Sequence, residues 1–273
     1  FNVAVTFVFL AMALSVSGAT LLFPKPIHIV RRLEDSLSNR PQTVDEYCYG
    51  SRIITVAGTH VTIVDYDSQL ITEIDHQQDT YSITRFDEIA RARAAFSRGL
   101  SSARSLKGDG PGWRINPTGE KRSPSGRSLD TVEMAREGVE GKERMEVGID
   151  RQVSLSRDAI EALIGASYPG VRTEHHDLLL GAASSPRGPG RAVNSDSTAQ
   201  ATVYGLPSEQ TVTIDFDGRE ITTRSRILSI DYETAPPEAL NIGPGAHRVE
   251  SRGVQLEREL MQLDQSAASG PKP

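Results

Sequence analysis

The densest group of side chains that could ligate a metal or move protons is the run Glu174-His175-His176-Asp177. A metal site needs such groups to converge from one side. On a strand, His175 and His176 would point to opposite faces, whereas both could ligate from a loop. We expect a polar surface loop at this position and keep a metal site as the alternative.

A second candidate for acid–base chemistry is the pair Asp75-His76. Adjacent residues on a strand diverge, and a base has to lie within hydrogen-bond reach of its partner. We therefore interpret the pair as flanking a turn. A hydrolase built on this pair, or on His175, His176 and Asp177, is the less favoured alternative. The chain contains no Gly-x-Ser-x-Gly elbow that would supply a serine nucleophile.

Two short acidic segments, Asp65–Ser68 and Asp215–Gly218, begin like calcium-binding loops. Both lack the further acidic ligand and the distal Glu that such a loop requires, so we interpret them as hairpin turns. The one cysteine, Cys48, excludes an internal disulfide and a cysteine-based zinc site, and we expect a free, buried thiol. We therefore predict no catalytic residue, no metal and no cofactor.

Composition also limits the function. The chain has 273 residues, a formal net charge of -6 and 37% hydrophobic residues, which is enough to bury a sizeable core. General nucleic-acid binding needs a cationic surface that displaces counterions. The acidic balance therefore argues against a nucleic-acid partner.

The elements that would position any site are strands in two blocks. In Arg52–Phe86, short runs rich in Ile, Val, Thr and Tyr are separated by turn formers, which predicts an antiparallel meander. Thr211–Tyr232 repeats the pattern around an Asp-Gly hairpin turn. The run His60–Tyr66 is apolar on both faces, so it is either central and covered or lines a cavity.

The apolar strand faces are the remaining functional surface. If helices cover them tightly, these residues are only core; if the packing leaves a cavity, they would bind a lipid or another apolar ligand. The candidate ligand-binding residues are Val61, Ile63, Leu70, Ile74, Tyr81, Ile83, Val212, Ile214, Phe216, Leu228 and Ile230.

The segment Phe1–Ala19 is uncharged, with an apolar run followed by small residues. This pattern is typical of a secretory signal, with an uncleaved membrane anchor as the alternative. We therefore expect an exported protein that is periplasmic, or anchored and facing the periplasm. Residues 20–42 would form a linker that contains a short helix at Pro26–Leu37.

The remaining chain alternates short strands and helices, and residues 43–250 would form one curved-sheet domain. Further strands are predicted at Val44–Tyr49, Trp113–Pro117, Ser128–Met134 and Arg144–Val153. Further helices are predicted at Phe86–Phe96, Ser156–Ala166 and Arg252–Gln265, the last within a C-terminal helical region at residues 251–265. We expect a mobile loop at Gly181–Gln200 and a disordered tail at Ser266–Pro273.

The order of these pieces resembles a family of exported bacterial proteins of unknown function whose fold is like that of the outer-membrane lipoprotein carriers and receptors. The similar segments are Tyr49–Ile83, Trp113–Arg122, Val147–Asp158, Thr211–Tyr232 and Ala235–Val249. The resemblance implies a mostly β (α+β) fold: a strongly curved antiparallel sheet, an incomplete barrel, with helices covering its concave face. In the carriers that face holds acyl chains, and the family pattern includes no catalytic residues.

These observations lead to one functional hypothesis. We expect a non-enzymatic exported envelope protein that binds an apolar or lipid-type ligand, or a partner protein of the envelope. The alternatives are a structural or interaction protein with a filled core and no ligand cavity, and the hydrolase named above.

Overall fold

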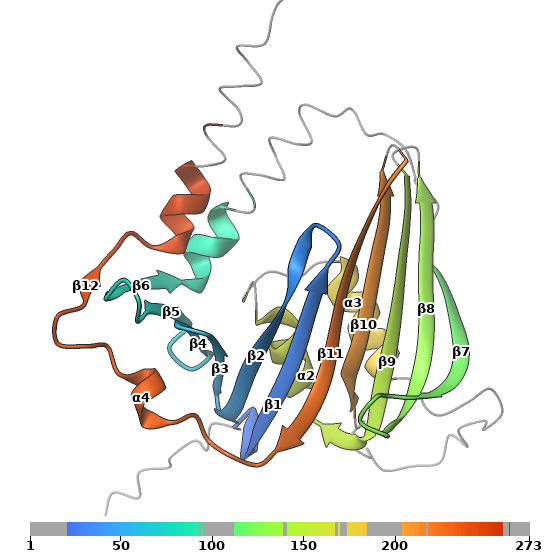
Figure 1. Cartoon of the computed structure of the whole chain (residues 1–273), viewed down its shortest axis with the longest axis horizontal. Coiled ribbons are helices and arrows are strands. Elements are labelled where there is room, and N and C mark those ends of the chain that lie inside the picture. Colours follow the sequence, from blue (N-terminus) through green and yellow to red (C-terminus); the bar gives the residue numbers. More distant parts are fainter. Residues whose placement is uncertain are drawn as a thin grey trace, which may run out of the picture.

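The structure is a computed structural model, in which the described chain forms one curved sheet with helices beside it (Figure 1). It describes residues 21–92, 94, 112–138, 141–166, 169, 174–184, 204–216, 218–258 and 262. The predicted signal segment, most of the predicted mobile loop and the predicted tail lie outside these residues.

The sheet has 12 strands in the order β12-β6-β5-β4-β3-β2-β1-β11-β10-β9-β8-β7. Its strands are β1 Phe23–Asp35, β2 Ser38–Gly50, β3 Arg52–Ala57, β4 His60–Asp65, β5 Leu70–Asp75, β6 Thr80–Arg85, β7 Arg114–Arg122, β8 Ser128–Gly138, β9 Gly141–Leu155, β10 Tyr204–Phe216, β11 Arg219–Asp231 and β12 His247–Arg248. All neighbours are antiparallel except β12, which pairs parallel to β6. The two ends of the sheet do not meet, so the predicted fold class, a mostly β, incomplete barrel, is confirmed.

The predicted helix at Pro26–Leu37 is wrong, because this segment lies within the central strand β1 and the turn that follows it. Ile27 and Ile29 are buried on one face of β1, and β2 and β11 pair with its two edges. The two prolines near its start fall where the register with β2 shifts, between Phe23 and Ile27. Proline is tolerated there because an irregular ladder needs no N–H at every position.

The helices are α2 Arg157–Gly165, α3 Glu174–Ser184, α4 Pro237–Leu240 and the helical residues 86–92 and 252–258. The predicted helix at Ser156–Ala166 is confirmed, and the Ser156 side chain accepts a hydrogen bond from the Ala159 N–H as its N-cap. The polar loop predicted at His175–Asp177 is wrong, since these residues form the first turns of α3. The first residues of the predicted mobile loop, Gly181–Ser184, also belong to α3.

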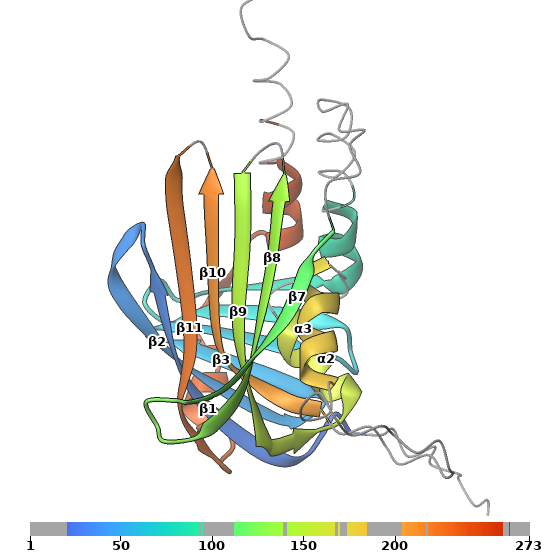
Figure 2. The same ribbon diagram turned by 90° about the vertical axis from the view of Figure 1, so that its right-hand side faces the viewer.

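Helices α2 and α3 cover the inner, concave face of the sheet, as the two views together show (Figures 1 and 2). Ile53 and Val64 pack there with Ile160 of α2 in one buried cluster. A neighbouring cluster joins Met145 of β9 to Leu179 of α3. The meander is thus bound to the rest of the molecule through its inner face.

The outer face of the meander is covered as well. After β11, residues 232–250, which we call the strap, run beneath the meander through α4 and reach β12 at the edge of β6 (Figure 1). Ala235 of the strap packs with Ile54, Val61 and Ile74 in a third buried cluster. Consecutive residues of β3, Ile53 and Ile54, therefore enter different clusters on opposite faces.

Two arginines form ion pairs with carboxylates of the sheet, and one of them, Arg151, also contacts a helix. Arg127 forms an ion pair with Asp150, whose side chain is fully buried. Arg151 pairs with Asp130 and donates to the backbone carbonyls of Ala182 and Ala183. Carbonyls at the C-terminal end of a helix lack partners within the helix, so Arg151 satisfies the end of α3.

Within the described part of the chain, we find no helix that combines the length and the apolar character needed to cross a membrane.

Candidate ligand cavity

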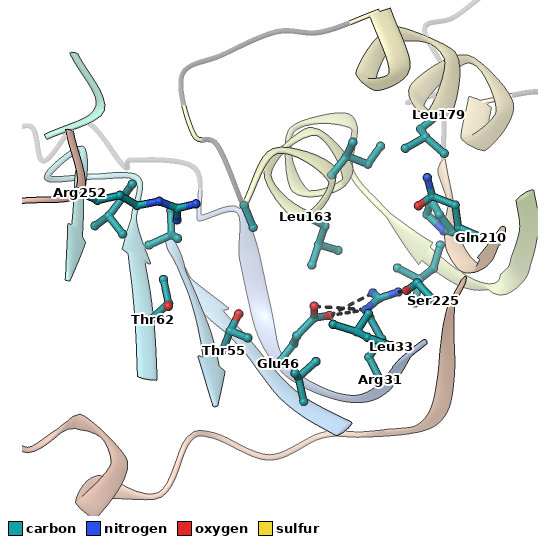
Figure 3. Close-up of a pocket in the computed structure, with 17 residues that line it drawn as sticks. Arg31, Leu33, Glu46, Thr55, Thr62, Leu163, Leu179, Gln210, Ser225 and Arg252 are labelled. Atoms are coloured by element: carbon teal, nitrogen blue, oxygen red, sulfur yellow. Dashed lines mark hydrogen bonds and ion pairs between the residues drawn. The ribbon is translucent and has the colours of Figure 1, made fainter. Parts of the chain in front are cut away.

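A cavity of about 380 Å³ lies on the concave face, between the sheet and helices α2 and α3 (Figure 3). Strands β1–β5, β10 and β11 and the start of the helical residues 252–258 contribute to its wall. Its apolar lining residues are Leu33, Val44, Val64, Ile71, Leu163, Ile164, Ala166, Leu179, Leu206 and Pro207. Apolar side chains therefore line it on both the sheet side and the helix side.

An ion pair lies in the sheet wall of this cavity. The Arg31 Nε lies 3.2 Å and 3.1 Å from the two carboxylate oxygens of Glu46, and its second terminal nitrogen lies 3.0 Å from Oε2. The other terminal nitrogen donates to the Ser225 hydroxyl at 3.1 Å. Both charged side chains are mostly buried, with 16% and 18% exposed. Strand alternation places both side chains here. Arg31 lies two residues after Ile29, and Glu46 lies two residues before Cys48, so each shares the inner face with its buried neighbour.

At the other end of the cavity, Arg252 enters the lining from the start of the last helical segment (Figure 3). Its backbone N–H donates to the Thr84 hydroxyl at 2.9 Å, and one guanidinium nitrogen lies 3.5 Å from a carboxylate oxygen of Glu73. The neighbouring Ser251 hydroxyl donates to Glu88 at 2.8 Å. These contacts fix the position of Arg252 relative to β5, β6 and the helical residues 86–92.

The lining also contains polar side chains. Among the lining residues, the polar ones are Arg31, Glu46, Thr55, Thr62, Gln210, Ser225 and Arg252. The lining contains no histidine or cysteine, and its one carboxylate is occupied by Arg31. A nucleophile beside a general base, which hydrolysis by a side chain requires, is not found among them.

The structure places the predicted ligand-binding residues elsewhere, since none of that set lines the cavity. Val61, Ile63, Ile74 and Tyr81 come together on the outer face beneath the strap. Leu70 and Ile83 are partly buried on the same faces of their strands as Ile74 and Tyr81.

The other members of the predicted set are scattered. Val212 and Ile230 join clusters on the inner face. Ile214 and Leu228 are 41% and 39% exposed. The side chain of Phe216 lies outside the described residues. A role for any of this set in ligand binding stays a prediction, and the cavity directs our proposal to different side chains.

The histidine cluster does not converge on one point. The His175 Nε2 lies 2.7 Å from a carboxylate oxygen of Glu143, and its ring packs edge-on against Trp113. His176 instead lies over Gly165 of α2, so close that a Cβ there would be 2.9 Å from its ring. Among the residues that the structure describes, no group of three or more His, Cys, Asp or Glu side chains could hold a metal ion.

The pair Asp75-His76 flanks a turn, as predicted. One carboxylate oxygen of Asp75 accepts from the backbone N–H groups of Gln77 and Gln78 at 2.9 Å and 3.1 Å. Cys48 is a free, buried thiol, which confirms that prediction. Burial raises the pKa of the Cys48 thiol, and the nearby Glu46 carboxylate raises it further.

Comparisons with known proteins give no family. No family model matches the chain, and no curated protein matches it. Among solved structures, PNGF-II in a C2 crystal is 6% identical with a TM-score of 0.36, over 88% of this chain and 33% of that chain. This chain therefore spans about a third of the length of that protein. A "putative outer membrane lipoprotein-sorting protein domain" from Vibrio parahaemolyticus is 6% identical with a TM-score of 0.28, over 78% of this chain and 87% of that chain. Both similarities are too distant to carry an argument about function.

Proposed function

We propose that this chain is a non-enzymatic binding protein of the cell envelope that holds an apolar or lipid-type ligand in the concave cavity. The observation that carries the proposal is the cavity itself. Its 380 Å³ falls within the roughly 300–1,000 Å³ of small-molecule sites. Export to the envelope rests on the signal-like segment Phe1–Ala19.

The energetics of such a site follow from its lining. Leu163 and Leu179 on the helices and Val64 and Ile71 on the sheet line the cavity. An acyl chain between them would be removed from contact with water on both of its sides. Burying about 300 Å² of ligand surface contributes roughly 7 kcal/mol before the cost of association. A single chain could therefore be held without a charged contact.

The two alternatives receive less support. A structural protein with a filled core would have no cavity between the sheet and α2. A hydrolase would bring His175, His176 or Asp75 together with another polar group in a cleft. His175 and His176 instead contact different elements, and none of these side chains lines the cavity.

The proposal is tested by titrating the full chain with N-phenyl-1-naphthylamine, a dye that fluoresces in apolar surroundings. We expect saturable binding by the wild-type protein. Leu163→Trp fills the cavity and should weaken binding at least about tenfold, which is about 1.4 kcal/mol. Leu228→Trp is the matched control, because Leu228 is 39% exposed and does not line the cavity.

Far-UV circular dichroism establishes that both variants are folded. Equal binding by Leu163→Trp and the wild type would contradict the proposal, as would a wild-type protein that never binds the dye.

A further inference from the structure

We propose that the Arg31–Glu46 pair makes the cavity selective for amphiphiles whose buried polar group is uncharged, such as an ester, a hydroxyl or an amide. This inference rests on the proposed function and names the class of ligand. Esters of glycerol and N-acyl amides both supply this chemistry.

The pair presents a neutral but strongly polar surface. Both oxygens of Glu46 accept from Arg31, and the remaining terminal nitrogen of Arg31 contacts the Ser225 hydroxyl. Uncharged polar side chains, Thr55 on β3 and Gln210 on β10, line the same cavity. The two charges cancel locally, so this part of the wall offers a ligand hydrogen bonds without net charge. The other cationic lining residue, Arg252, lies at the opposite end of the cavity and pairs with Glu73 at 3.5 Å.

A ligand carboxylate is disfavoured at this position. To engage Arg31, it has to displace Glu46, and the Glu46 carboxylate would then be left unpaired in a mostly buried site. Removing one partner from a buried ion pair is strongly destabilising, because the other charge stays uncompensated. If the pair stays intact, the ligand carboxylate instead lies next to a second negative charge.

A ligand ammonium group that engages Glu46 has to displace Arg31, whose charge would then be left unpaired in the cavity wall. A hydroxyl or an amide does not, because it can donate to Glu46 or accept from the Ser225 hydroxyl while the pair stays formed. The neutral group also loses less hydration on entering the cavity than an ion does. The hydrocarbon chain can then lie against Leu163 and Leu179.

The inference is tested by displacing N-phenyl-1-naphthylamine from the full chain with four ligands that share a dodecyl-length chain. These are monododecanoylglycerol, dodecanamide, dodecanoate and dodecyltrimethylammonium. We expect the two neutral ligands to displace the dye at concentrations about tenfold lower than the two ions. Whichever neutral ligand binds more tightly indicates an acylglycerol or an N-acyl source.

Substitution of the acidic partner should switch this preference. Glu46→Gln leaves Arg31 charged and unpaired in the cavity, so dodecanoate should bind about tenfold more tightly and dodecyltrimethylammonium more weakly. The double variant Arg31→Gln/Glu46→Gln is neutral again and should return to the wild-type order. Glu143→Gln is the matched control: Glu143 is 11% exposed and pairs with Arg136 at 2.7 Å outside the cavity.

The possible failures are distinguishable. A wild-type protein that binds the dye in a Leu163→Trp-sensitive manner, but takes dodecanoate as readily as dodecanamide, would overturn the selectivity alone. An unchanged order in Glu46→Gln would do the same. A wild-type protein that binds no dye would instead overturn the proposed function. If Glu46→Gln does not fold, Arg31→Gln decides the inference instead. It leaves Glu46 charged in the cavity, so dodecyltrimethylammonium should bind more tightly and dodecanoate more weakly, and an unchanged order would overturn the selectivity.

Discussion

Replacing Ile74 with alanine should destabilise the protein about three times as much as the same change at Ile214. Ile74 is 3% exposed and packs beneath the strap, whereas Ile214 is 41% exposed near the end of β10. The two residues share chemistry and strand context, so the comparison isolates burial. The difference between the two variants tests whether the outer face of the meander is a second hydrophobic core.

The magnitudes follow from the burial of each side chain. At a buried site, isoleucine to alanine removes apolar groups worth roughly 0.8 kcal/mol per methylene and leaves a cavity, for a total of about 3 kcal/mol. At Ile214 part of the side chain already contacts water, and no closed cavity forms. The expected loss there is about 1 kcal/mol.

The assay is equilibrium urea unfolding followed by far-UV circular dichroism. The denaturant dependence should be the same for both variants, so that the shift of the midpoint reports the free energy of unfolding. Dye binding supplies a second comparison. Ile74→Ala should bind N-phenyl-1-naphthylamine like the wild type, whereas Ile71→Ala should alter binding because Ile71 lines the cavity.

Equal destabilisation by Ile74→Ala and Ile214→Ala would refute the reasoning, since it would mean that the strap does not bury the outer face. A loss of dye binding in Ile74→Ala, with the fold intact, would show that the ligand site includes that face. It would then support the predicted set of ligand-binding residues instead of the cavity.

Three further changes test other parts of the fold. Asp150→Asn should cost about 3 kcal/mol of unfolding free energy, because it leaves Arg127 without its buried carboxylate; a change under about 1 kcal/mol would contradict this. Ser156→Ala removes the cap that accepts from Ala159 and should cost about 1 kcal/mol by urea unfolding, with no change in the slope. Burial raises the pKa of the Cys48 thiol, so its contribution to stability is complete below about pH 8.5 and falls by about 1.4 kcal/mol per pH unit above it. The pH dependence of urea midpoints between pH 8 and 10 should therefore be shallower in Cys48→Ala, and identical dependences would contradict the effect.

Local patterns were sufficient for some elements. The meander strands β3–β6 and the hairpin β10–β11 are predicted by short runs of alternating apolar and polar residues, each bounded by turn formers. Helix α2 follows from its cap and its apolar side. These features depend on neighbours in the chain, which the sequence displays directly.

Other elements depend on distant partners. Arg31–Glu34 contains good helix formers, and only pairing with β2 and β11, the latter nearly 200 residues away, makes it a strand. In the same way, Glu174–Ser184 becomes a helix because Leu179 and Ala182 pack against β8 and β9.

The ligand cavity was the hardest feature to predict. In β4, Val61 and Val64 are both buried, one beneath the strap and the other at the cavity. Alternation separates the two faces but does not say which of them meets α2. Arg31 and Glu46 gave no local signal, because a charged pair in a strand normally points to water. Only the sheet order places them in the cavity wall together.

Native mass spectrometry of the full chain, purified under mild conditions that retain bound lipid, tests the binding claim most directly. We predict a population that carries an added mass, released on activation and identified by extraction as a neutral amphiphile. The same adduct should be missing from Leu163→Trp and present on Leu228→Trp. A wild-type protein that shows only the bare chain mass, or an equal adduct on Leu163→Trp, would contradict a ligand in the concave cavity.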